Sequence, residues 1–189
     1  MAKQRVINIR GTSGSGKSTL IRRLVELYPE KEPVFVPNRR QPLFYKLRGE
    51  GLAPVSLLGH YETACGGCDT IPSMDRIYEL VRERLAEGDS VLYEGLLISA
   101  EVNRAVALHN DGFDLTVVRL STPVELCIDS VNQRRWAKDP EKPPVNPKNT
   151  ESKFKQTLAS SKKLSDAGVK VVEADREEAY NVIKQLLEA

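Results

Sequence analysis

The chain has 189 residues, of which 40% are hydrophobic and 29% charged, and its formal net charge is +2. A chain of this size and composition is globular, large enough for one well-buried domain and too small for two ordinary ones. It contains no apolar run of about 18 residues, no hydrophobic leader segment and only three cysteines, which argues against a membrane protein or a disulfide-rich secreted one. We therefore expect a single cytoplasmic domain over residues 1–189.

The first predicted elements are a strand and a helix joined by a glycine-rich loop. Residues 6–9 form a β-branched apolar run, and apolar residues recur at helical spacing from Leu20 to Tyr28, where Pro29 ends the pattern. Between them stands Gly11-Thr12-Ser13-Gly14-Ser15-Gly16-Lys17-Ser18, which matches the complete phosphate-binding pattern Gly-x-x-x-x-Gly-Lys-Ser/Thr. A strand, a glycine loop and a helix are the setting that this pattern requires.

Each part of this loop has a physical role in binding a nucleotide. The glycines let backbone N–H groups approach a polyphosphate closely, and the following helix directs its positive dipole end at the anion. Lys17 can reach the β- and γ-phosphates, and the Ser18 hydroxyl is a natural Mg²⁺ ligand. We therefore predict that ATP and Mg²⁺ bind at Gly11, Thr12, Ser13, Gly14, Ser15, Gly16, Lys17, Ser18 and Thr19.

The middle of the chain continues the alternation of strands and helices. Strands are predicted at residues 34–36, 55–58 and 91–93, the last ending at Glu94. Helices are predicted from Pro42 to Arg48, from a cap at Ser73 to Glu87, and roughly from Ala100 to His109. Gly49 and Gly88 follow the first two helices, in the position that glycine favours after a helix.

The C-terminal part contains a buried strand, a long helix and a proline-rich loop. Residues 115–120 are almost continuously apolar, as in a buried parallel strand. Thr122-Pro123-Val124-Glu125 has the form of a capping box and predicts a helix to about Trp136. The remaining elements are predicted as a loop over 137–149, a helix from a cap at Thr150 to Leu164, a strand over 169–172 and a helix over 177–188.

This order of elements predicts an α/β fold, a three-layer sandwich with helices on both faces of a mostly parallel sheet. Ligands of such sheets bind beyond the carboxyl ends of the strands. The glycine loop, Glu94 and the stretch from Gly59 to Thr70 all follow predicted strands, so we expect them to converge at one edge of the sheet.

The stretch from Gly59 to Thr70 gathers reactive side chains around a Gly-Gly pair. Its Cys65 and Cys68 could form a redox pair or, with His60, bind zinc, but a structural zinc site needs four ligands, and the remaining Cys127 and His109 fall in predicted helices. A structural turn is a further possibility. The preferred interpretation is a polar acceptor pocket, in which Asp69 or Glu62 orients or deprotonates a hydroxyl and His60 or Tyr61 binds the acceptor.

Positive charge is concentrated in one segment. Residues 131–163 carry nine Lys and Arg against Asp139, Glu141 and Glu151, which gives +6 in a chain whose total is +2. A basic segment of this kind indicates either an anionic partner or a solvated helix face.

The chain resembles the small phosphate-loop kinases of the nucleoside and nucleotide kinase group, by its size, its early glycine loop and its basic segment. It lacks the Asn-Lys-x-Asp guanine signature of GTPases. The resemblance implies a nucleotide kinase-like fold with a mobile lid, here roughly 132–152, whose Arg134 and Arg135 stabilise the transferred phosphoryl group. It also implies that Glu94 holds Mg²⁺ through water or takes a proton, and that Asp175 lies against the adenine.

The glycine loop together with the 59–70 string also resembles bacteriophage kinases that phosphorylate 5-hydroxymethyl pyrimidines in DNA. That resemblance implies a DNA-modifying enzyme, with Arg39, Arg40 and the basic segment along DNA phosphates. The sequence therefore predicts an ATP- and Mg²⁺-dependent kinase acting on a hydroxyl of a nucleic acid or nucleotide. The alternatives are a kinase of a free nucleoside, nucleotide or other small alcohol, and a nucleotide-binding regulatory ATPase.

Overall fold

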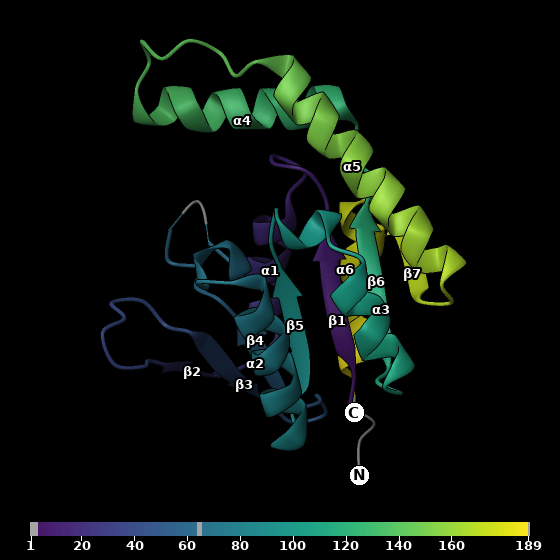
Figure 1. Cartoon of the computed structure of the whole chain (residues 1–189). Helices are drawn as coiled ribbons and strands as arrows, with labels where there is room; N and C mark the ends of the chain where they lie inside the picture. Colours follow the sequence, from purple (N-terminus) through teal and green to yellow (C-terminus); the bar gives the residue numbers. More distant parts are fainter. Residues whose placement is uncertain (1–3, 64–65, 189) are drawn as a thin grey trace.

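The computed structural model describes residues 4–63 and 66–188, which form one seven-stranded sheet covered by helices on both faces (Figure 1). The strands are β1 (Val6–Arg10), β2 (Glu30–Val34), β3 (Phe44–Arg48), β4 (Val55–Leu58), β5 (Ser90–Glu94), β6 (Leu115–Leu120) and β7 (Lys170–Ala174). Their order across the sheet is β2-β3-β4-β5-β1-β6-β7. The strands from β4 to β7 in that order run parallel, whereas β2 and β3 add an antiparallel hairpin at one edge.

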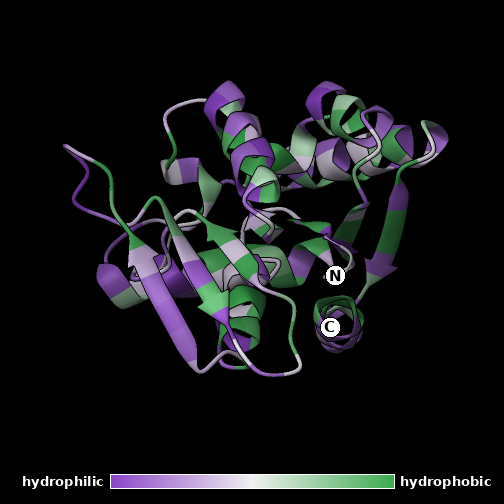
Figure 2. Cartoon of the chain, turned by 90° about the horizontal axis from the view of Figure 1, so that it is seen from below, coloured by the Kyte–Doolittle hydropathy of each residue, from purple (hydrophilic) through white to green (hydrophobic). Residues whose placement is uncertain are grey.

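Two hydrophobic cores hold the helices to the sheet. The helices are α1 (Lys17–Val25), α2 (Met74–Ala86), α3 (Asn103–Asn110), α4 (Val124–Lys138), α5 (Pro147–Asp166) and α6 (Arg176–Leu187), with short 3₁₀ turns η1 (Cys68–Thr70) and η2 (Ile98–Ala100). One core joins α2, α3 and the end of α5 to the sheet, and the other joins α1 and α6 to its opposite face. Hydrophobic residues accordingly gather on the middle strands in Figure 2. The predicted three-layer sandwich is confirmed.

Three predicted elements differ from the structure in type or in position. The segment from Pro42 to Arg48 is not a helix but contains strand β3, because Phe44 and Leu47 are buried where β3 pairs with β4. The strand expected at 34–36 lies at Glu30–Val34, so that the exposed Phe35 belongs to the β2–β3 loop. The helix expected from Ala100 begins at Asn103 because η2 occupies the preceding residues.

Two predicted helix caps are also corrected. Thr122 does not cap α4, since its Oγ1 donates to the carbonyl oxygen of Ser15, 2.8 Å away in the phosphate loop. Thr150 lies inside α5, which begins at Pro147 and is capped by Asn146. Proline at the first helical position and an Asn cap before it form a stronger start than Thr150 offers. The proline-rich loop is therefore shorter than predicted.

Helix α4, the loop over residues 139–146 and the first half of α5 project beyond the carboxyl ends of the strands (Figure 1). We call this projection, residues 124–156, the arm. It is closed on itself by hydrogen bonds from Trp136 Nε1 to the carbonyl oxygen of Lys142 and from the Val145 backbone N–H to Asn132 Oδ1. The predicted lid falls within the arm, and its mobility stays a prediction. Among the described residues, no helix combines the length and apolar character that crossing a membrane requires.

Candidate active site

A cavity of about 690 Å³ lies at the carboxyl edge of the sheet, between the glycine loop and the arm. Its walls come from five parts of the chain that the sequence keeps far apart. The residues that line the cavity are Ser13, Gly14, Gly16, Lys17, Ser18, Thr19 and Arg22; Gly66, Asp69 and Thr70; Glu94 and Leu96; Ser130, Gln133, Arg134 and Ala137; and Arg176. The predicted convergence of the glycine loop, Glu94 and part of the 59–70 stretch is thus observed.

The glycine loop has the backbone that only glycine permits at two positions. Gly14 and Gly16 have φ of 82° and 102°, in the left-handed region. A Cβ at Gly14 would lie 2.2 Å from the carbonyl oxygen of Cys127, and one at Gly16 would lie 2.5 Å from Arg176 Nε. The loop is therefore packed against α4 and α6 as tightly as its sequence allows.

Lys17 is buried at the centre of the loop. Its Nζ donates to the carbonyl oxygens of Gly11, at 2.7 Å, and Thr12, at 3.2 Å. Burial lowers the pKa of Lys17, and the nearby carboxylate of Glu94 opposes that shift. A buried ammonium that is bound only to loop carbonyl oxygens is suited to exchange them for the oxygens of a phosphate.

Glu94 ends β5 beneath the loop and is buried. Its Oε1 accepts a hydrogen bond of 3.0 Å from Ser18 Oγ. Burial raises the pKa of Glu94, and the Lys17 charge partly opposes the shift. A hydroxyl and a carboxylate at this distance form the small oxygen donor set that Mg²⁺ uses when substrate phosphates and water complete its shell. The residues present therefore fit the predicted ion.

Asp69 lines the same cavity and is held by a different set of contacts. Its carboxylate oxygens accept hydrogen bonds from the backbone N–H groups of Leu96, at 2.8 Å, and Leu97, at 3.2 Å. Asp69 is exposed, in contrast to Glu94. Both carboxylates line the one cavity, but their partners differ: Glu94 is bound to Ser18 of the glycine loop, and Asp69 to the backbone that follows β5.

The remaining predicted acceptor residues lie outside the cavity lining. His60 is buried, with its Nδ1 3.4 Å from Glu62 Oε2, and Tyr61 donates from its hydroxyl to the carbonyl oxygen of Leu58. Tyr45 donates its hydroxyl to Glu62. The side chains of His60, Tyr61 and Glu62 thus contact other parts of the protein and not the cavity. From the same stretch of the chain, Gly66, Asp69 and Thr70 line the cavity.

The cysteine hypotheses are only partly accessible to the structure. Cys65 lies outside the described residues. Cys68 is buried, and burial raises the pKa of its thiol well above the usual value, which disfavours a reactive thiolate. No metal-binding cluster of three or more His, Cys, Asp or Glu occurs in residues 4–63 and 66–188.

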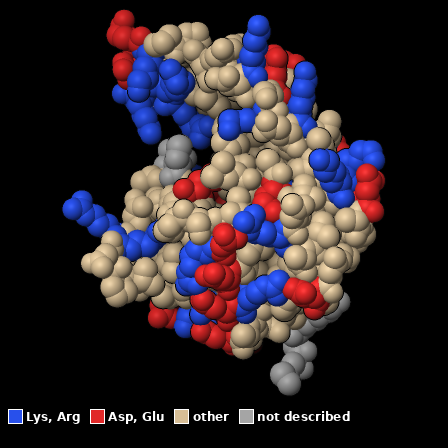
Figure 3. Space-filling view, viewed as in Figure 1, with Lys and Arg blue, Asp and Glu red and all other residues tan. Residues whose placement is uncertain are grey.

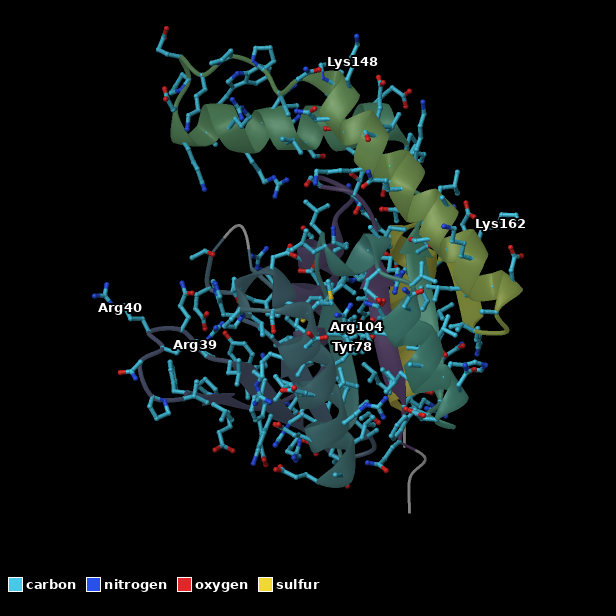
Figure 4. All side chains as sticks on the ribbon, in the orientation of Figure 1. Arg39, Arg40, Tyr78, Arg104, Lys148 and Lys162 are labelled. Atoms are coloured by element: carbon cyan, nitrogen blue, oxygen red, sulfur yellow. The ribbon has the colours of Figure 1, made fainter. Side chains whose placement is uncertain are left out.

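Of the four arginines predicted to bind phosphates, one lines the cavity and the other three lie outside its lining. Arg134 lines the cavity from α4, whereas Arg135 donates from Nε to the carbonyl oxygen of Pro143 and so supports the arm. Arg39 donates to the carbonyl oxygen and the hydroxyl of Thr70, at 2.8 and 3.0 Å. Arg40 extends from the tip of the β2–β3 loop (Figure 4).

Sequence reasoning missed two arginines that line the cavity. Arg22 projects from α1, four residues and one helical turn after Ser18, and its Nη2 donates to the carbonyl oxygen of Thr63 at 2.7 Å. The spacing from Ser18 was an available signal for Arg22. Arg176 begins α6, and its Nε donates to the carbonyl oxygen of Ser15 at 3.0 Å. No local pattern predicts this contact of Arg176, because only the fold brings α6 to the glycine loop.

Asp175, expected against the adenine, is the cap of α6. Its Oδ1 accepts hydrogen bonds from the backbone N–H groups of Glu177 and Glu178, at 2.8 and 2.9 Å, in a capping box. Asp175→Ala is therefore expected to lower the free energy of unfolding by about 1 kcal/mol, while KM for ATP stays within about twofold of the wild-type value. Urea unfolding and steady-state kinetics measure both quantities. A KM for ATP raised tenfold at unchanged stability would instead show that Asp175 contacts the nucleotide.

Comparison with known proteins identifies close relatives. The chain is 87% identical over 189 residues, all of both chains, to a protein named 5-hmdU DNA kinase from Pseudomonas phage PaMx11. It is 29% identical to the 5-hmdU DNA kinase of Delftia phage PhiW-14, covering 91% of this chain and 68% of the relative. It is also 29% identical to that of Pseudomonas phage M6, covering 70% and 73%. No family model matches the sequence. From the full-length identity to the first of these relatives, we conclude that the chain belongs to the 5-hmdU DNA kinase family.

Proposed function

We propose that this protein transfers the γ-phosphoryl group of ATP to the hydroxyl of a 5-hydroxymethyl pyrimidine in DNA. The observation that carries the proposal is one cavity that is lined both by a complete phosphate-binding loop and by a separate, backbone-held carboxylate, Asp69. A kinase needs these two ends, one for the donor phosphates and one for the acceptor hydroxyl. The names of the relatives supply the acceptor class.

At the donor end, the backbone N–H groups of the glycine loop and Lys17 bind the phosphates of ATP. Ser18 and Glu94 would hold Mg²⁺ at this end of the cavity. When bound, the ion neutralises negative charge that develops on the phosphates. Arg134 and the two further arginines of the lining, Arg22 and Arg176, stabilise the charge that spreads over the γ-phosphoryl oxygens during transfer.

At the acceptor end, Asp69 orients the hydroxymethyl group and accepts its proton. The hydroxyl oxygen forms a bond to the γ-phosphorus, and the bond from that phosphorus to the β–γ bridging oxygen breaks, leaving ADP. Asp69 suits this role better than Glu94, because the hydrogen bond from Ser18 directs Glu94 toward the metal end of the cavity. The peptide N–H groups of Leu96 and Leu97 hold the Asp69 carboxylate in place for the proton transfer.

The two carboxylates should give different kinetic defects when their charges are removed. Glu94→Gln is expected to lower turnover about 100-fold and to raise the Mg²⁺ concentration needed for half-maximal rate, because the ion loses a charged partner. Asp69→Asn should lower turnover by about 100-fold to 10,000-fold at an unchanged Mg²⁺ requirement. Initial rates over a matrix of Mg²⁺ and substrate concentrations measure both effects.

Glu62→Gln is the matched control for these variants, since Glu62 lies in the same turn but outside the cavity lining. Its turnover should stay within about threefold of the wild-type value. The assignment of the two roles is wrong if Asp69→Asn shifts the Mg²⁺ requirement and Glu94→Gln does not.

The proposed reaction is tested by offering ATP labelled in its γ-phosphate to several acceptors in parallel. These are duplex DNA containing 5-hydroxymethyluracil, the same duplex containing thymine, and a panel of free nucleosides and nucleotides. Label retained only on the hydroxymethylated duplex supports the proposal. Label on a free nucleotide alone supports a small-molecule kinase, and release of inorganic phosphate with every acceptor supports a regulatory ATPase.

A further inference from the structure

Ion pairs are distributed unevenly among the arginines of the described chain. Most arginines of the sandwich lie within ion-pair distance of a carboxylate, namely Arg5, Arg23, Arg48, Arg76, Arg82, Arg84, Arg104 and Arg119. None of the Lys and Arg residues of the arm, which is described along its whole length, has such a partner. Figure 3 shows red and blue side chains interleaved over the body, and a cluster of blue ones with a few red ones at the free end of the arm. The arm thus has seven Lys and Arg that make no ion pair, against five Asp and Glu, and its net charge is +2.

The shape of the arm exposes this charge rather than burying it. Helix α4 has 15 residues, of which only Cys127 and Asn132 are buried. A helix that is polar on nearly all sides gains little from packing on its own protein. The arm overhangs a hollow between its free end and the β2–β3 loop, visible on the left of Figure 3. A partner in that hollow would lie directly at the mouth of the catalytic cavity.

One cation of α4 is placed to reach this hollow from above. Ser130, Gln133, Arg134 and Ala137 line the cavity, so they define the face of α4 that looks toward the body. Lys138 follows Arg134 by four residues and therefore lies on the same face, about 6 Å further toward the free end. Lys138 is exposed and outside the cavity lining. Lys138 therefore continues the cavity-facing side of α4 beyond the end of the cavity.

The β2–β3 loop offers a second cation on the facing side. Arg40 is exposed at its tip, and Figure 4 shows its side chain extended into solvent. Phe35, on the same loop, is 55% exposed, so the loop presents an aromatic surface together with a charge. The hydrogen bonds from Arg39 to Thr70 tie the loop to η1, which contains Asp69. The position of Arg40 is thereby fixed relative to the acceptor end of the cavity.

We propose that the hollow between the arm and the β2–β3 loop binds the phosphate backbone of the DNA beside the target base, with Lys138 on one side and Arg40 on the other. The inference rests on the proposed function, which brings the target base to Asp69. Unpaired Lys and Arg side chains on two sides of a groove suit a polyanion, because each phosphate contact releases counterions. The exposed Phe35 ring on the same loop as Arg40 offers a stacking surface of the kind that nucleic-acid-binding grooves use. In this arrangement Arg134 contacts the phosphates of ATP in the cavity, and Lys138, one helical turn away, contacts a phosphate of the DNA.

Lys148 provides an internal control for this geometry. It belongs to the same arm, is exposed and lies outside every ion pair found in the described chain, but Figure 4 shows its side chain pointing away from the body and the hollow. Lys31 is an exposed lysine on β2, between Glu30 and Glu32. A double variant Lys148→Ala/Lys31→Ala therefore removes the same number of charges from the arm and from the β2 side as Lys138→Ala/Arg40→Ala removes.

The experiment is a titration of fluorescently labelled duplex DNA containing 5-hydroxymethyluracil, followed by anisotropy at several salt concentrations without ATP. Lys138→Ala/Arg40→Ala is expected to weaken binding about 10-fold to 100-fold and to reduce the slope of log K against log salt by about 2, since two phosphate contacts are lost. The control double variant should stay within about twofold of wild type at unchanged slope. Thermal unfolding of both variants checks that they fold.

Each other outcome overturns the inference. Equal weakening by the two double variants would mean that general charge, and not the hollow, attracts DNA. Wild-type affinity in Lys138→Ala/Arg40→Ala would place the DNA elsewhere. Either result leaves the proposed function intact if the wild-type protein still transfers label to hydroxymethylated DNA. If the wild-type protein transfers no label to that DNA, the proposed function itself is wrong.

Discussion

Lys17→Met is expected to lower phosphoryl transfer by about 1,000-fold or more while the protein remains folded. Methionine keeps the length and apolar stem of the side chain but removes the charge that would stabilise the transferred group, and a single such charge contributes factors of this size. Burial already lowers the pKa of Lys17, so the folded state carries a penalty for the ammonium ion. The variant should therefore unfold at the same temperature as wild type or a higher one.

Steady-state kinetics with ATP and hydroxymethylated DNA, together with thermal unfolding, test this expectation. Lys31→Met is the matched control, because Lys31 is an exposed lysine on β2 and outside the cavity. Transfer by Lys17→Met within tenfold of wild type would show that another group binds the phosphates. A large drop in unfolding temperature would show that Lys17 serves mainly the structure of the loop.

Glu101→Ala is expected to destabilise the fold more than any surface substitution. The Glu101 carboxylate accepts hydrogen bonds from the backbone N–H groups of Arg104 and Ala105 at the start of α3, and from the Tyr78 hydroxyl at 3.1 Å. It also opposes the lowering of the pKa of Arg10, whose guanidinium is fully buried and donates to the carbonyl oxygen of Glu101 at 2.6 Å. Removal of the carboxylate leaves a buried cation poorly compensated and a helix start without its acceptor.

Loss of the helix-start acceptor and of the Tyr78 partner beside this buried cation costs about 2–4 kcal/mol. In a chain of this size we expect the unfolding temperature to fall on the order of 10 °C. Urea unfolding of Glu101→Ala, Glu101→Gln and the surface variant Glu125→Ala measures the effect, with the glutamine variant intermediate because its amide oxygen still accepts hydrogen bonds. A loss below about 1 kcal/mol in Glu101→Ala would mean that water or another group compensates Arg10.

The parts of this protein that sequence reasoning predicted well are those determined by local patterns. The glycine loop requires a fixed set of residues at fixed spacing, and Ser73 caps α2 as its own sequence suggests. Errors arose where distant contacts decide the structure. Strand β3 forms within residues 42–48 because β4 pairs with it. Thr122 does not cap α4 because its hydroxyl donates to the carbonyl oxygen of Ser15.

The same distinction applies to the site. Glu94 could be predicted because it ends a strand beside the loop, and the sequence left the proton acceptor open between Glu94 and Asp69. Their different hydrogen bonds, to Ser18 and to the Leu96 and Leu97 backbone, give a physical reason to separate them. Arg39 and Arg40 are adjacent in sequence and look equivalent there, but one is bound to Thr70 and the other is exposed.

The central claim is that the acceptor is a hydroxymethyl group on a base within DNA. The most direct measurement is mass spectrometry of the mononucleotides released from a 5-hydroxymethyluracil duplex after incubation with the enzyme, ATP and Mg²⁺, using a nuclease digestion without phosphatase. We predict that the 5-hydroxymethyl-2′-deoxyuridine monophosphate gains the mass of one further phosphoryl group and that thymidine monophosphate from the same duplex gains none. An unmodified hydroxymethylated base, with phosphate found instead on a free nucleoside or only in solution, would contradict the account.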